Sequence, residues 1–189
     1  MNNIYIIIAV ALVLVITGAI LGPIFARRRR SAQFQDKFGA EYERSVQSTG
    51  NEKKAQTELN ERRKYVDALN IRPLSVGERD GYLTKWSDVQ AKFVDQPGQA
   101  TIEADHLIME VMQLRAYPVS DFEQRAADIS VNYPSLVTNY RAARETAIRN
   151  EHHQAGTEDL RKAMINYRSL FNELLLTETV PPEKQAAQK

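Results

Sequence analysis

The chain has 189 residues, with 25 basic and 24 acidic side chains and no cysteine. The absence of cysteine excludes disulfide bonds, thiolate catalysis and cysteine-ligated zinc sites. The near balance of charge gives no indication of a nucleic-acid-binding protein, because such proteins carry a clear excess of Lys and Arg.

The chain begins with an uncharged apolar segment, residues 4–26, which is followed by Arg27, Arg28, Arg29 and Arg30. A helix over this segment measures about 35 Å at about 1.5 Å per residue, which is enough to cross a hydrocarbon core of about 30 Å. The segment is too long for a secretory signal and has no basic start. Residues 1–30 are therefore predicted to form a retained transmembrane anchor with a basic flank.

The four arginines also predict an orientation, because basic flanks of a span stay on the cytoplasmic side. We expect a single-pass protein of the inner or plasma membrane, with its N-terminus outside and its C-terminal domain in the cytoplasm. The same arginines are expected to contact anionic lipid head groups. Gly18 and Gly22 form one GxxxG motif, a pattern that supports helix dimers in membranes and is compatible with a homo-oligomer.

Residues 31–70 have the pattern of a charged helical stalk. Apolar side chains at a spacing of four predict one helix over 31–49, with Ser31 as its cap and Gly50 at its end: Phe34, Phe38, Tyr42 and Val46. Residues 51–69 are rich in charge and carry only a thin apolar stripe. We expect the two segments to form a stalk or a helical hairpin just below the membrane.

The predicted fold class is all-α, and residues 71–177 are predicted to form a compact bundle of several helices. Pro73 interrupts the preceding helix, and Ser75 with Glu78 forms a capping box that begins the next one. Further helices are expected over 102–114, at a second capping box formed by Ser120 and Glu123, with Pro134 at a first helical position, and from Thr157. Residues 128–133 are open between strand and loop, and the polar tail 178–189 is expected to be disordered.

Three stretches resemble an uncharacterised family of bacterial single-span membrane proteins with a C-terminal helical domain. They are NIRPLS at 70–75, the segment 117–143 and TEDLRKAMINYRSLFNELL at 157–175. The resemblance implies an architecture of one span, a basic flank, a charged helical stretch and a compact domain. It implies no activity and no site residues.

The candidate metal ligands are Glu103, His106 and Glu110. Glu103 and His106 are three residues apart and Glu110 is four further on, so a helix presents all three on one side. A Glu-x-x-His motif is used in di-metal carboxylate bundles, which need a second such motif on a facing helix. The sequence has no second motif, and a polar helix face is the favoured interpretation.

The candidate recognition loop comprises Tyr117, Pro118, Asp121 and Tyr133, because loops carry function more often than cores do. Aromatic residues such as Trp86, Phe93 and Phe171 recur at helical spacing. Core packing is the favoured interpretation of that spacing, with a cofactor or peptide groove as the alternative.

The function predicted from these patterns is a membrane-anchored, cytoplasm-facing helical interaction or scaffold module. No catalytic constellation is evident, since the chain has three histidines and neither a Gly-x-Ser-x-Gly motif nor a phosphate-binding glycine loop. We therefore expect no enzyme activity and no cofactor. The expected partners are lipids, through residues 4–30, and an unidentified protein, but no nucleic acid. The alternative is a helical bundle domain, held at the membrane, that binds a small ligand or a metal.

Overall fold

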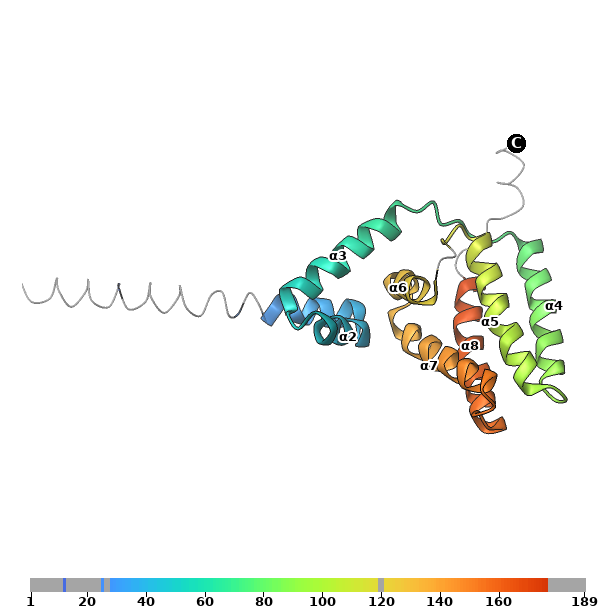
Figure 1. Ribbon diagram of the computed structural model, residues 1–189. Helices are drawn as coiled ribbons and strands as arrows, with labels where there is room; N and C mark the ends of the chain where they lie inside the picture. The colour runs from blue at the N-terminus through green and yellow to red at the C-terminus, as the bar shows by residue number, and fades with distance from the viewer. Residues whose placement is uncertain (1–11, 13–24, 26–27, 119–120, 177–189) are drawn as a thin grey trace, which may run out of the picture.

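The computed structural model describes residues 12, 25, 28–118 and 121–176, and this part of the chain is all-α, as predicted (Figure 1). Residues 28–38 are helical. The helices that follow are α2 (Ala40–Thr49), α3 (Glu52–Ala68), α4 (Val76–Lys92), α5 (Pro97–Leu114), α6 (Phe122–Asn132), α7 (Pro134–Glu151) and α8 (Thr157–Leu176).

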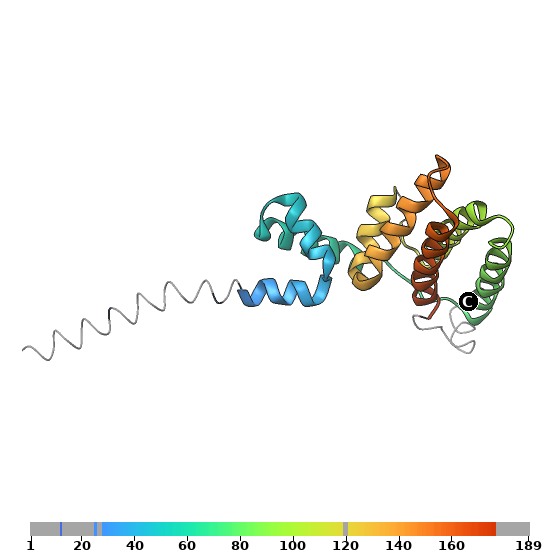
Figure 2. The ribbon, with the colours of Figure 1, turned by 90° about the horizontal axis from the view of Figure 1, so that it is seen from below.

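The first helices form a small unit, called here the hairpin lobe and comprising residues 28–68. Helices α2 and α3 pack against each other, and buried side chains give the lobe a core of its own: Phe38, Tyr42, Ala55 and Leu59. Figure 2 shows the lobe beside α6 and α7, which it contacts through α2 and α3. The predicted stalk thus has the form of a helical hairpin.

The predicted helix over 31–49 is interrupted at Gly39. The backbone there has φ 52° and ψ −130°, which only glycine adopts without strain. The Gly39 N–H donates to the Gln35 carbonyl at 2.8 Å and so closes the preceding helix. The apolar stripe continues across the break, which is why spacing alone predicted one helix.

The larger unit, called here the bundle, comprises residues 71–176. Helix α5 packs against α4, α7 and α8, and α7 packs along α8. The bundle core draws on every one of its helices, and its largest fully buried side chains are Tyr140, Tyr167, Phe171, Leu74, Ile108, Met112, Ile129, Leu170, Leu174 and Leu175.

Local sequence signals determine where several bundle helices begin. The Ser75 side chain accepts from the Glu78 N–H at 3.2 Å, and Glu78 accepts from the Ser75 N–H at 2.8 Å, so the predicted capping box is confirmed. Pro134 occupies the first turn of α7, as predicted. Residues 128–132 complete α6, so the stretch left open between strand and loop is helical.

The structure contradicts the predicted localisation as a single-pass membrane protein. Among the residues that the structure describes, no helix is both long and apolar enough to cross a membrane. The physical reason is that α2–α8 all carry charged side chains, which a hydrocarbon core does not accept. Most of residues 4–26, Arg27 and the tail 178–189 lie outside the described residues. Arg28, Arg29 and Arg30 lie in the helical segment 28–38 and are exposed.

Candidate interaction site

The three candidate metal ligands lie along one helix, α5, where two of them bind lysines. Glu110 accepts from the Lys85 ammonium at 2.7 Å, and Glu103 pairs with Lys92. Both lysines belong to α4, so the two carboxylates join α5 to α4. His106 lies between them and is exposed. In the described ranges, no group of three or more His, Cys, Asp or Glu side chains is arranged to hold a metal ion.

Within the candidate recognition loop, Tyr117 is buried against the bundle core. Its hydroxyl accepts a hydrogen bond from the Asn132 amide at 2.8 Å, and burial raises the pKa of the Tyr117 phenol. Pro118 is half-buried beside it, and residues 119–120 lie outside the described part of the chain. Tyr117 therefore fastens the end of α5 to α6.

The two other members of the candidate loop have different surroundings. The Tyr133 hydroxyl accepts from the Arg115 guanidinium at 2.9 Å, and the same nitrogen donates to the Leu174 carbonyl at 2.9 Å. Asp121 caps α6 by accepting from the Gln124 N–H at 3.1 Å, and it lines a surface pocket. The structure thus does not gather the four residues into one surface, and their role in recognition stays a prediction.

A buried polar cluster joins α5, α7 and α8. Asp105 is buried and pairs with Arg144 at 3.3 Å, and its burial raises the pKa of its carboxyl group. Burial also raises the pKa of Tyr140 to about 12 and shifts the pKa of Tyr167 upward. The rings of the two tyrosines meet edge to face, with centroids 6.1 Å apart. This cluster lies among the side chains that hold three helices together.

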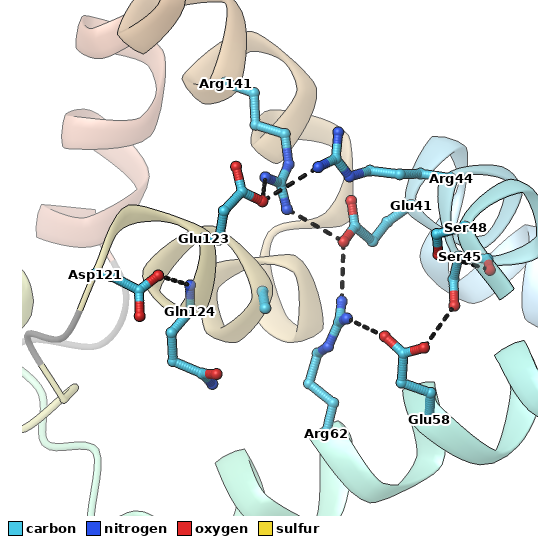
Figure 3. A pocket seen from close by; sticks show the side chains of 11 residues that line it. Glu41, Arg44, Ser45, Ser48, Glu58, Arg62, Asp121, Glu123, Gln124 and Arg141 are labelled. Carbon is cyan, nitrogen blue, oxygen red and sulfur yellow. Dashed lines mark hydrogen bonds and ion pairs between the residues drawn. The ribbon is translucent and has the colours of Figure 1, made fainter.

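A polar pocket of about 320 Å³ lies between the hairpin lobe and the bundle, and it is called here the inter-lobe pocket (Figure 3). Its walls come from α2, α3, α6 and α7 and from the Asp121 cap. The charged and polar side chains that line it are Glu41, Arg44, Ser45, Ser48, Glu58, Arg62, Asp121, Glu123, Gln124 and Arg141.

The charged groups of the inter-lobe pocket are paired with one another. The buried carboxylate of Glu41 accepts from Arg62 at 2.9 Å and from Arg141 at 3.4 Å (Figure 3). Glu123 binds Arg141 and also accepts from Arg44 at 3.2 Å. A buried ion pair stabilises a contact only where such partners compensate for lost hydration. This network connects the two lobes.

An apolar groove of about 190 Å³ lies between α4 and α8, and it is called here the α4–α8 groove. It is lined by Trp86, Gln90, Phe93, Arg161, Met164, Ile165 and Arg168. The lining residues recur at intervals of three and four along each helix, so each helix presents one face to the groove. Figure 2 shows α4 and α8 standing apart at this end of the bundle.

Two kinds of apolar side chain make up this surface. Trp86 is only 4% exposed and stacks on Phe171, with ring centroids 4.6 Å apart. Ile165 on α8, which also lines the groove, is 49% exposed. The buried indole N–H of Trp86 has no hydrogen-bond acceptor within the described structure. The groove therefore combines an aromatic wall with one apolar side chain, Ile165, left in water.

Comparisons of the chain with protein-family models, with curated proteins and with solved structures found no match. The resemblance to a family of bacterial single-span proteins therefore stays a prediction.

Proposed function

We propose that the chain is a helical interaction module whose binding surface is the α4–α8 groove. The observation that carries the proposal is this groove, in which Trp86, Phe93 and Met164 form an apolar wall and Ile165 is left half exposed. Exposed apolar surface at a groove marks contact sites, and aromatic side chains with arginines are the residues that dominate such contacts. The proposal assigns no reaction to the chain.

The bundle provides a firm base for this surface. Trp86 and Met164 belong to the same core cluster as Phe171 and Tyr167, so the groove wall is held by core packing. A preformed wall lowers the ordering cost of binding, because fewer side chains lose freedom when a partner docks. An interaction surface built in this way keeps its shape in the free protein.

A second candidate, the binding of a small polar ligand, has one supporting observation in the inter-lobe pocket. Arg44, Glu58 and Glu123 lie on its exposed side, where a ligand with both charges would meet them. The ion pairs among these residues compete with any such ligand. The apolar groove, where Ile165 is not covered by other side chains of the chain, is therefore the better-supported site.

The proposal is tested by replacing Ile165 with a photo-crosslinking amino acid in the full chain and irradiating living cells. We expect a discrete covalent adduct, because this side chain lies in the groove and is exposed. Ile148 on α7 is the matched control: it is 42% exposed and does not line the groove.

The mass of the adduct separates the outcomes. An adduct formed at position 165 and not at 148 supports the proposal. Equal labelling at both positions, or labelling at neither, contradicts it. An adduct of twice the chain mass identifies the partner as a second copy of this chain.

A further inference from the structure

We infer that the occupant of the α4–α8 groove is an acidic amphipathic helix of a partner protein. This inference rests on the proposed function and names the chemistry of the partner.

The shape of the groove fits a helix. Its walls are two helices that run in opposite directions in Figure 1. Side chains about one turn apart line it: Trp86 and Gln90 of α4 with Phe93 at the C-cap of α4, and Arg161, Ile165 and Arg168 of α8. A helix laid into such a groove inserts apolar side chains at positions i, i+3, i+4 and i+7. The contact buries the partner's apolar face against Ile165 and Phe93 and against the small exposed edges of Trp86 and Met164.

The charge of the groove selects an acidic partner. Two of its lining residues are arginines, and none is acidic. Arg161 pairs with Glu158 of its own helix, where both groups are more than half exposed, and Arg168 has no ion-pair partner among the described residues. Both guanidinium groups flank the apolar wall, so carboxylates beside the apolar face of a docked helix meet them. Charge complementarity of this kind directs partner choice.

The segments of this chain that lie outside the described structure do not have the required composition. Residues 1–26 contain no charged side chain. Residues 178–189 contain two glutamates and two lysines, so they carry no acidic excess. A separate acidic partner is the occupant that complements the arginines.

The test uses the full chain and three designed peptides of 17 residues, the length of α4. All three carry one leucine face, and the remaining positions hold mainly glutamate, glutamine or lysine. Fluorescence anisotropy of the labelled peptides measures affinity. Trp86, the only tryptophan in the chain, reports by its emission whether the groove is filled, provided that the peptides lack Trp and Tyr.

We expect the acidic peptide to bind about tenfold more tightly than the lysine peptide at low salt. The difference shrinks at high salt, because the Debye length falls from about 10 Å at 0.1 M to about 3 Å at 1 M. Arg168→Glu removes the preference. Lys162→Glu is the matched control, since Lys162 is exposed on the same helix but does not line the groove.

The remaining outcomes overturn the inference in distinguishable ways. Equal affinity of all three peptides with a change in Trp86 emission leaves an interaction groove but contradicts an acidic partner. Tighter binding of the lysine peptide, or an Arg168→Glu variant that keeps the preference, contradicts it as well. If no peptide binds, the acidic helix is wrong, and crosslinking at position 165 still decides the proposed function separately.

Discussion

Glu78 is held ionised by the residues around it. Hydrogen bonds from Arg72 at 2.8 and 3.1 Å, together with the Ser75 N–H, lower the pKa of Glu78 to about 2. Because the native pKa lies below the unfolded value, the charge of Glu78 stabilises the fold at neutral pH. That contribution is lost as the pH falls from about 4.5 towards about 2.

Glu78→Gln therefore lowers the free energy of unfolding by about 1 kcal/mol at neutral pH, a low value because the pair is partly exposed. Glutamine keeps the capping-box acceptor, so the change isolates the charge. Urea denaturation at several pH values should show the difference from wild type shrinking below about pH 4. Glu145→Gln, at an exposed site without an ion pair in the described structure, should show no such trend. A constant difference down to pH 2 contradicts this account.

At the scale of the element, Gly39 decides the shape of the hairpin lobe. Gly39→Ala places a Cβ at φ 52°, although no heavy atom lies within 4 Å of it, so its cost is conformational and not steric. We expect the free energy of unfolding to fall by about 2 kcal/mol, measured by urea denaturation. Gly81→Ala within α4 is the control and should raise it by about 0.5 kcal/mol or more. A neutral Gly39→Ala variant means that the break is not required.

Element boundaries were predictable where the signal is local. The capping box of Ser75 and Glu78 and the proline at position 134 are each recognisable within a window of about four residues. Each stands at the start of a helix in the structure. The break at Gly39 was missed because Phe38 and Tyr42 keep their spacing on either side of it. Glu103 and Glu110 were correctly placed on one helix side, but their lysine partners lie on α4 and are set by tertiary packing.

At the scale of the whole molecule, Glu41 connects the hairpin lobe to the bundle. Its carboxylate forms ion pairs with Arg62 of its own lobe and with Arg141 of α7. Glu41→Gln removes the carboxylate charge that two largely buried guanidinium groups share. We therefore expect the free energy of unfolding to fall by about 3 kcal/mol. Amide hydrogen exchange should accelerate in α2 and α3 and stay unchanged in α5 and α8.

The control for this change is Glu61→Gln, an exposed glutamate on α3 that forms no ion pair in the described part of the molecule. It removes the same charge from the same lobe. Faster exchange in both variants, or in neither, means that the Glu41 network does not hold the lobes together.

Neither surface was the favoured prediction from the sequence, and the reasons differ. The inter-lobe network joins residues as far apart as Glu41 and Arg141, a pairing that no local pattern encodes. The α4–α8 groove was obscured because Trp86 and Phe93 have the spacing of core residues. Trp86 is buried, as that spacing indicates. The groove beside it results from the way α4 and α8 are placed, which the spacing does not encode.

The central claim, that an acidic helix docks in the α4–α8 groove, is tested most directly by disulfide crosslinking. Because the chain has no cysteine, Ile165→Cys introduces its only thiol. The acidic peptide carries one cysteine on its leucine face, activated as a mixed disulfide with thionitrobenzoate, so that attack by the protein thiolate forms the new disulfide and releases thionitrobenzoate. We expect a high yield with Ile165→Cys and a low yield with Ile148→Cys. Equal yields at the two positions would contradict it.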